Sequence, residues 1–430
     1  MMGRRRRSLL EQSIQVLLIV GLLCSLPMTR SFTSSNCRFS HRFSTFIATT
    51  RDSSPYPAQI SIVGGGLAGL STAYHFLTKI DDRNASVTIY DKCPVGEGGA
   101  SAVAGGLLHP LSPRGNKLSH WGLEGLFATR KLVDEAAKFA PHCVLREKLY
   151  RVALTDENVQ ALQHVATNVL PEHCRWMEKK ELDKLLDTSD SLGGVELYNG
   201  CRVIHVPSYL RGLLAACQLR GRVEWKIIDD YMELVNHRHD ENVQNDGSRI
   251  WIFACGAGII QEGFFDEDAR AKLPLQIVRG QSVELTITDE SVPREAALCG
   301  KYVTPLLDHN RMLVGATQEF QEEAVSPRDL QEELKRKSYK LAPALWDKAD
   351  IHRITCGYKV QSQRNNLGRV PIIGRLGKDW IFTGLSSRGL LYHAIYGEKL
   401  VDMIFASQGT QKDSEECPIA KQYPHLKWWK

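Results

Sequence analysis

A glycine-rich turn between a short β-branched run and an amphipathic segment constrains this chain more than any other feature. Residues 60–63 (ISIV) have the composition of a buried parallel strand. The next residues supply Gly64, Gly66 and Gly69 at GxGxxG spacing, and apolar residues then recur at helical intervals as far as Leu77. In such a unit the first glycine makes a tight turn, the second lets backbone approach a pyrophosphate, and the third lets the helix pack closely on the strand. The pattern predicts a helix N-terminus that binds phosphate.

A second strand and an acidic residue complete this unit. Residues 86–90 (SVTIY) are expected to form the strand, and Asp91 at its end follows Gly69 by 22 residues. An acid in this position accepts hydrogen bonds from ribose hydroxyls, so the unit predicts a site for adenosine diphosphate. FAD and NAD share that moiety, and the unit alone does not distinguish them. The residues predicted to contact it are Gly64, Gly66, Leu67, Ala68, Gly69, Asp91 and Lys92.

Charge and cysteine content limit the other functions open to the chain. The formal net charge of the 430 residues is +5, but residues 1–51 hold eight arginines and a single acidic residue, so the remainder carries about −2. A nearly neutral remainder gives no global electrostatic argument for nucleic acid as a partner. Eleven cysteines are irregularly spaced and include no CxxC pair. This spacing indicates neither a disulfide framework nor a zinc site, and we predict no metal.

The first 51 residues are predicted to be a targeting segment rather than part of the fold. Four arginines precede an apolar run at 14–28 that is shorter than the ~20 residues of a membrane span. Residues 1–28 are therefore interpreted as a signal peptide, with an uncleaved anchor as the alternative. Residues 29–51 have transit-peptide composition, and the two segments together resemble the bipartite presequences of algae with secondary plastids, with Phe32 at the cleavage position. We expect a plastid location, with the mitochondrion as the alternative, and no stable membrane partner after processing.

Later segments resemble the D-amino acid oxidase (DAO) family of FAD-dependent oxidoreductases. The Gly- and Ala-rich residues 96–110 (GEGGASAVAGGLLHP) resemble the family loop that runs along the pyrophosphate toward the isoalloxazine ring. Residues 251–258 (WIFACGAG) resemble the strand that closes over the adenosine side, and residues 273–285 and 302–317 resemble the substrate-lobe sheet. Residues 357–404, which include TGLSSRGLL, resemble the segment whose helix directs its N-terminus at the pyrimidine end of the flavin.

The resemblance implies an α/β fold, with a Rossmann-like FAD-binding domain of GR2/DAO type and a discontinuous substrate lobe built on a mixed β-sheet. Within an oxidoreductase domain at 52–430, the implied FAD lobe spans about 58–135, 200–265 and 355–410, and the substrate lobe about 136–199 and 266–354. Further FAD contacts implied by the resemblance are Ser101, Ala102, Gly105, Gly106, Leu107, Tyr231, Ala254, Gly256, Gly384, Ser387, Arg388, Gly389 and Leu390. A helix N-terminus or Arg388 would stabilise the negative charge that reduction places near flavin N1 and O2.

The implied reaction is oxidation of a C–N bond of an amine or amino-acid-like substrate, with oxygen or another electron acceptor regenerating the flavin. His109, Lys359 and Tyr302 are the predicted catalytic residues, and Gln281 is a further candidate near the ring. Lys359 stands where the family often has the arginine of Gly-x-Arg, so a point charge replaces a bidentate fork. The alternatives are a structural histidine at 109 and a solvated side chain at Lys359 or Arg388.

Two other functions stay open. GGLLHPLSPRG and residues 199–217 most resemble the oxidase domain of the MnmC type, which acts on a wobble uridine of tRNA. This branch implies a tRNA side chain, carboxymethylaminomethyl-uridine in an organelle, as the alternative to a small-molecule amine. The remaining alternative is a flavin-binding assembly factor without turnover.

Overall fold

The computed structural model divides the chain into two compact units, Met1–Ser53 and Ser54–Lys430. Its described residues are 59–81, 84–188, 190–230, 233–236, 249–260, 264–320, 325–408, 422, 423 and 426. The predicted signal and transit segments lie outside the described residues, and so does Tyr231. None of the helices in the described part of the chain is long and apolar enough to cross a membrane.

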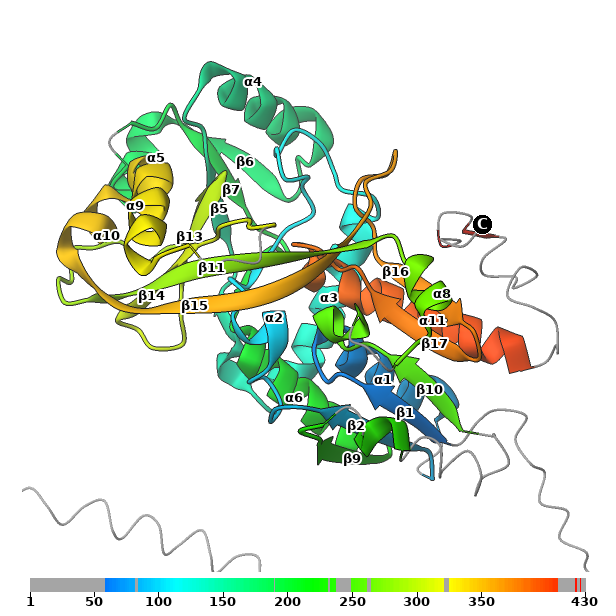
Figure 1. The fold of residues 1–430 in the computed structure, drawn as a ribbon. Helices are drawn as coiled ribbons and strands as arrows, with labels where there is room; N and C mark the ends of the chain where they lie inside the picture. Colours follow the sequence, from blue (N-terminus) through cyan, green and yellow to red (C-terminus); the bar gives the residue numbers. More distant parts are fainter. Residues whose placement is uncertain are drawn as a thin grey trace, which may run out of the picture. The chain divides into compact units, whose positions relative to one another are not determined.

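A six-stranded sheet carries the glycine-rich turn (Figure 1). Its strand order is β16-β17-β10-β1-β2-β9, with all neighbours parallel except the edge strand β16. The strands are β1 (Gln59–Val63), β2 (Ser86–Asp91), β9 (Arg222–Ile227), β10 (Ile250–Phe253), β16 (Ile372–Leu376) and β17 (Asp379–Thr383). Four of the five β1 residues are buried, as a strand covered on both faces requires. The carboxyl ends of the parallel strands therefore gather at one edge, where ligands bind in open α/β sheets.

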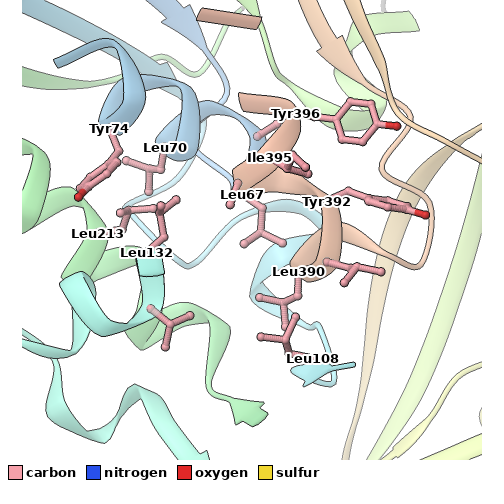
Figure 2. Packing of buried hydrophobic residues seen from close by; sticks show 14 of the residues in the cluster. Leu67, Leu70, Tyr74, Leu108, Leu132, Leu213, Leu390, Tyr392, Ile395 and Tyr396 are labelled. Carbon is pink, nitrogen blue, oxygen red and sulfur yellow. The ribbon is translucent and has the colours of Figure 1, made fainter. Parts of the chain in front are cut away.

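Four helices pack together on one side of this sheet. They are α1 (Leu67–Ile80), α3 (Gly122–Ala137), α6 (Val206–Gln218) and α11 (Gly389–Gln408). Figure 2 shows Leu70 of α1 beside Leu132 and Leu213, and Leu67 beside Leu390 and the following turn of α11. The opposite face of the sheet is covered by the segment that includes α8 (Glu267–Ala271). Both faces of the sheet are therefore buried, and this burial holds the strands in place at the edge where the site is predicted.

A mixed sheet of eight strands forms the other half of the unit. Its order is β15-β11-β14-β13-β12-β5-β7-β6, and only the β12–β5 pair is parallel. The strands are β5 (Leu149–Val152), β6 (Cys174–Met177), β7 (Gly194–Leu197), β11 (Leu275–Ile287), β12 (Ala297–Cys299), β13 (Lys301–Pro305), β14 (Arg311–Gly315) and β15 (Ala349–Ser362). Helices α5 (Lys179–Leu186), α9 (Pro327–Ser338) and α10 (Pro343–Lys348) pack on one face, as Figure 1 shows. The other face contacts residues 100–105 of the first half.

Smaller elements connect the two halves. A three-stranded sheet has the order β3-β8-β4, with strands β3 (Leu107–Leu108), β8 (Arg202–Ile204) and β4 (Val144–Arg146). Helices α2 (Gly99–Ala102) and α4 (Asp156–His164) also belong to the described part of the chain. Because β15 runs unbroken past residue 355, one strand crosses the predicted boundary between the lobes.

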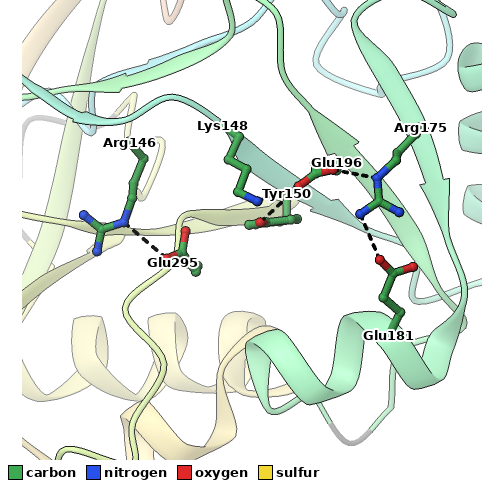
Figure 3. A network of polar contacts seen from close by, with 7 residues as sticks. All are labelled: Arg146, Lys148, Tyr150, Arg175, Glu181, Glu196 and Glu295. Atoms are coloured by element: carbon green, nitrogen blue, oxygen red, sulfur yellow. Dashed lines mark hydrogen bonds and ion pairs between the residues drawn. The ribbon is translucent and has the colours of Figure 1, made fainter.

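A carboxylate network ties β5, β6 and β7 together at the far end of the eight-stranded sheet (Figure 3). Glu196 lies opposite Tyr150 and Arg175 on the flanking strands. It accepts hydrogen bonds from Lys148 Nζ at 2.8 Å and from Arg175 Nε at 2.6 Å. Burial alone would raise the pKa of Glu196, but these two cations hold the pKa below its ordinary value. The charged form of Glu196 therefore stabilises the fold.

Candidate active site

The predicted cofactor residues that the structure describes gather at the carboxyl edge of the six-stranded sheet. Five lie in the β1–α1 turn and the start of α1, two at the end of β2 and just after it, five from α2 to the start of β3, two after β10, and five from the end of β17 to the start of α11. In that order they are Gly64, Gly66, Leu67, Ala68 and Gly69; Asp91 and Lys92; Ser101, Ala102, Gly105, Gly106 and Leu107; Ala254 and Gly256; and Gly384, Ser387, Arg388, Gly389 and Leu390. Five separate stretches of sequence thus meet along one edge.

Close approaches explain the glycines of the first turn. A Cβ on Gly69 would lie 1.9 Å from the carbonyl oxygen of Gly64, so α1 packs directly on its own turn. A Cβ on Gly64, which has a φ of +97°, would lie 2.6 Å from the carbonyl oxygen of Ala254 after β10. At Gly66 the nearest atom to an added Cβ would be the Ser101 hydroxyl oxygen, at 3.0 Å. Gly64 and Gly69 therefore serve packing, whereas an added Cβ at Gly66 would meet only the side chain of Ser101.

The N-terminus of α1 fits a pyrophosphate. Its cap residue Gly66 has no side chain to satisfy the first N–H groups, and no acidic residue lies in the first turn. Leu67 N donates to Ser101 Oγ at 3.4 Å, and the N–H groups that follow it are available to an anion. At the end of β2, the Asp91 carboxylate accepts hydrogen bonds from Gly65 N at 2.7 Å and Cys93 N at 3.0 Å. A carboxylate fixed beside the phosphate-binding turn suits a ribose, so these residues fit the ADP half of FAD.

The N-terminus of α11 lies beside that of α1. Gly384, with a φ of +74°, turns the chain after β17, and α11 begins at Gly389. A Cβ on Gly389 would lie 3.0 Å from Leu67 Cδ1, so the two helix starts are in contact. The buried His393 ring fixes this turn, because Nδ1 lies 3.1 Å from two carbonyl oxygens of the first turn and Nε2 lies 2.7 Å from the Tyr209 hydroxyl. The N-termini of α1 and α11 thus lie side by side.

One face of the eight-stranded sheet packs against the loop after α2, and we call this contact region the chamber. Residues of β11, β13, β14 and β15 share the face: Gly280, Ser282, Tyr302, Gly315, Gly357 and Lys359. A Cβ on Gly357 would lie 2.6 Å from Val103 Cγ2, and one on Gly105 would lie 2.6 Å from the Tyr302 ring. The sheet and the predicted flavin loop are therefore in direct contact, and the glycines make room between them.

Two predicted catalytic residues line the chamber. The Tyr302 hydroxyl lies 3.4 Å from Ser282 Oγ, and burial raises the pKa of Tyr302. Lys359 is half-buried and has no hydrogen-bond or ion-pair partner among the described residues. Burial lowers the pKa of Lys359, because nothing nearby offsets the cost of removing its charge from water. The chamber therefore offers an unpaired cation to a ligand.

Gln281 lies outside the chamber. Side chains alternate along a strand, so Gln281 lies on the face opposite to that of Ser282. There its amide donates to Glu319 at 3.0 Å, and Arg279 pairs with the same carboxylate at 2.7 Å. The structure therefore does not bring Gln281 together with Tyr302 and Lys359, because the RGQ segment alone does not reveal which face of β11 each residue joins.

His109 and Arg388 meet at the end of the flavin loop. An Arg388 guanidinium nitrogen lies 3.5 Å from His109 Nε2, and His109 is 4% exposed. Burial and, secondarily, the charge of Arg151 lower the pKa of Arg388 to about 10. Among the described residues, no carboxylate pairs with Arg388 or with Arg151.

Arg151 is a residue that the sequence analysis missed. It lies in β5, is 5% exposed, and donates to the carbonyl oxygens of Ser112 and Pro113. A Cβ on Gly115 would lie 2.2 Å from Arg151 Nε, so the loop after His109 wraps around the guanidinium. Burial lowers the pKa of Arg151 to about 10. The available signal was a lone arginine within the otherwise apolar stretch LYRVA.

A surface cleft of about 640 Å³ adjoins the chamber. Its lining includes Val103, which contacts the chamber, Thr355 of β15, three arginines and three acidic residues. Among the described residues, no group of three or more His, Cys, Asp or Glu side chains is placed to hold a metal ion.

A family model and several known proteins match most of the chain from residue 59 onward. A family model described as FAD dependent oxidoreductase (DAO) matches residues 59–403. Glycine oxidase of Pseudomonas putida is 26% identical over 309 residues, which cover 67% of this chain and 78% of that protein. The tRNA 5-methylaminomethyl-2-thiouridine biosynthesis bifunctional protein MnmC of Chromobacterium violaceum is 27% identical over 278 residues, which cover 62% of this chain but only 40% of that protein.

Solved structures support the fold. Glycine oxidase from Bacillus cereus superposes with a TM-score of 0.62 at 16% identity, over 83% of this chain and 96% of that one. Iminodiacetate oxidase from Chelativorans superposes with a TM-score of 0.60 at 18% identity, over 80% and 95% of the two chains. The expected α/β fold, a Rossmann-like sheet joined to a mixed sheet, is confirmed, and the family match confirms FAD as the cofactor.

Proposed function

Because the chain belongs to the DAO family of FAD-dependent oxidoreductases, we propose that it oxidises the C–N bond of an amine that also carries a carboxylate. The observation that carries this proposal is Lys359, a half-buried cation on the chamber face without a partner among the described residues. A buried charge is stable when an opposite charge accompanies it, and a substrate carboxylate supplies that charge.

The chain's own residues have binding and shielding tasks. FAD, when bound, supplies the acceptor for the hydride that leaves the substrate carbon next to nitrogen. Lys359 binds the carboxylate as a point charge, which fixes one end of the substrate. Tyr302 lies against Gly105 and Gly315, so its ring closes the chamber toward the flavin loop and excludes water.

The relatives support this class of substrate. By their names, one acts on glycine and another on iminodiacetate, and both compounds carry an amine one carbon away from a carboxylate. The carboxymethylaminomethyl group of a modified uridine has the same reacting unit. The proposed substrate is therefore an amino acid or an N-carboxymethyl amine.

Anaerobic mixing of the purified flavoprotein with candidate amines tests the proposal. Glycine, sarcosine and iminodiacetate are compared with methylamine and benzylamine, which lack a carboxylate. We expect bleaching of the oxidised flavin band by carboxylate-bearing amines alone. Equal bleaching by benzylamine would contradict the role of Lys359. No bleaching either by these amines or by tRNA that carries carboxymethylaminomethyl-uridine would favour the assembly factor without turnover.

Variants of Lys359 sharpen the same experiment. Hydrogen bonds to charged groups contribute about 1.5–3 kcal/mol, so Lys359→Met should raise the half-bleaching concentration by roughly 10- to 150-fold. Lys359→Arg keeps the charge and should retain most of the affinity. A Lys359→Met variant that matched the wild type would remove the basis of the proposal.

A tRNA side chain is the second candidate substrate. The 27% identity to MnmC favours it, and so does the cleft of about 640 Å³ beside the chamber, which leaves room for a large substrate. The charge of the cleft does not add to this argument, because its three arginines are matched by Glu97, Glu284 and Asp308. We further propose a plastid location, which a fluorescent fusion to residues 1–53 would test. Unprocessed carboxymethylaminomethyl-uridine in organellar tRNA after gene loss would support the tRNA candidate, and normal tRNA would reject it.

A further inference from the structure

We infer that Trp225 is a positioning residue for the adenosine half of FAD. Its indole fixes Gly65 and Cys93, whose N–H groups hold the Asp91 carboxylate beside the phosphate-binding turn. This role of Trp225 goes beyond the proposed function, because it concerns how firmly the cofactor is held and is independent of the substrate.

Gly65 is the glycine of the β1–α1 turn that the nucleotide-binding pattern leaves unexplained. The GxGxxG spacing admits any residue at position 65, and the backbone there is outside the left-handed region. A Cβ on Gly65 would nevertheless lie 2.0 Å from Trp225 Cη2, although real Cβ atoms keep at least 3.0 Å from such neighbours. The indole, rather than the backbone conformation, therefore requires glycine at this position.

The indole reaches this turn from the edge of the six-stranded sheet. Trp225 is half-buried and lies in β9 opposite Ile89 of β2, and β2 separates β9 from β1 (Figure 1). Neighbouring strands lie about 4.8 Å apart, so a ring that starts on β9 and contacts Gly65 crosses the end of β2. There Trp225 Nε1 donates to the carbonyl oxygen of Cys93 at 3.2 Å. One side chain thus contacts the segments that follow two neighbouring strands.

The Asp91 carboxylate is held by the same two residues that Trp225 contacts. Gly65 N donates to one carboxylate oxygen at 2.7 Å, and Cys93 N donates to the other at 3.0 Å. Each oxygen keeps a further lone pair with which it can accept from a ribose hydroxyl. A shift of either N–H group would turn the carboxylate, and hydrogen bonds weaken steeply as their angle falls. Trp225 therefore acts on the ribose through Asp91.

The alternative is a purely structural role for Trp225. The ring also packs against the core between the sheet and its helices, where it would anchor the edge strand β9. The two roles differ in what loss of the ring changes. Lost packing lowers the stability of the apoprotein, whereas lost positioning lowers the affinity for FAD and does so only where Asp91 is present.

Titration of the full-length apoprotein with FAD, followed by flavin fluorescence, tests the inference. Trp225→Leu should weaken FAD binding about tenfold, the lower end of what a hydrogen bond to a charged group contributes. Trp176→Leu is the matched control, because Trp176 is also half-buried, donates through Nε1 to Glu178 at 2.9 Å, and lies 2.6 Å from a Cβ placed on Gly193. Trp176 belongs to β6 of the other sheet, so its loss should leave FAD affinity unchanged.

A double-mutant cycle with Asp91→Asn separates positioning from packing. If Trp225 acts through Asp91, Trp225→Leu should weaken FAD binding about tenfold in the wild type but less than about twofold in Asp91→Asn. Equal losses in the two backgrounds would assign Trp225 to packing and overturn the inference. So would a Trp225→Leu protein that loses apoprotein stability but binds FAD as tightly as the wild type. Neither measurement involves a substrate, so this outcome is distinct from failure of the proposed function.

Gly65→Ala gives a second measurement that keeps the tryptophan and applies even if Trp225→Leu fails to fold. The new methyl group must displace the indole from the Cys93 carbonyl oxygen, so FAD binding should again weaken about tenfold. Because both substitutions remove the same contact, Gly65→Ala should add less than about twofold to the loss in Trp225→Leu. A Gly65→Ala protein with wild-type FAD affinity, or fully additive losses in the double variant, would overturn the inference.

Discussion

Two glycines of the β1–α1 turn should respond differently to the same substitution. In Gly69→Ala the new methyl group would lie 1.9 Å from the Gly64 carbonyl oxygen, a backbone atom that has no freedom to rotate away. In Gly66→Ala the nearest atom is Ser101 Oγ at 3.0 Å, which belongs to a side chain that rotates. The backbone at Gly66, with φ −76° and ψ −161°, also accepts alanine.

The magnitudes follow from these contacts. Real Cβ atoms do not approach closer than 3.0 Å, so Gly69→Ala must force α1 away from its turn. Overpacking of this kind costs about 1–3 kcal/mol and lowers the melting temperature of the apoprotein by several degrees. Gly66→Ala should change apoprotein stability by less than about 0.5 kcal/mol. Its methyl group fills the space for the pyrophosphate, and a loss of about 1–3 kcal/mol weakens FAD binding roughly 5- to 150-fold.

Two assays separate these effects. Thermal unfolding of the apoproteins measures stability, and titration of the apoproteins with FAD, followed by flavin fluorescence, measures affinity. We expect Gly69→Ala to lower both quantities and Gly66→Ala to lower affinity alone. Equal losses of apoprotein stability in the two variants, or FAD affinity within twofold of the wild type in Gly66→Ala, would refute the assignment of the phosphate to this turn.

Two further predictions concern ionisable residues. Glu196→Gln should lower the free energy of unfolding by about 1.5–3 kcal/mol at neutral pH, as measured by urea denaturation. Because the folded pKa of Glu196 is depressed, the difference between variant and wild type should vanish as pH falls through that pKa. A difference that does not depend on pH would contradict the network. Because burial lowers the pKa of Lys359, KM for a carboxylate-bearing amine should begin to rise at a pH below the ordinary lysine pKa of about 10.4. Lys359→Arg should show no such rise. A wild-type KM that stays constant up to pH 10.4 would contradict the binding role of Lys359.

The nucleotide-binding unit was predictable because its signals are local. The strand, the turn with Gly64 and Gly69, and Asp91 lie within one short stretch, and each residue type has a geometric reason there. The resemblance to the DAO family extended the prediction to the turn before α11, which the structure places beside α1. Here the sequence sufficed for both the element and its place at the sheet edge.

The chamber was less predictable because its members meet through tertiary packing. The resemblance named Tyr302 and Gln281 alike, but the register of β11 turns Ser282 toward Tyr302 and Gln281 toward Glu319. Arg151 comes from a strand with no motif, and its position follows only from the pairing of β5 with β7 and β12. Long-range register decides which face of a strand meets the cofactor, and no single segment encodes it.

The visible absorption spectrum of the purified protein, recorded before and after anaerobic addition of a carboxylate-bearing amine, tests the central claim most directly. The protein should contain about one FAD per chain, and its oxidised flavin band should disappear on mixing and return when air is admitted. A folded protein that is colourless and does not take up added FAD would contradict the account.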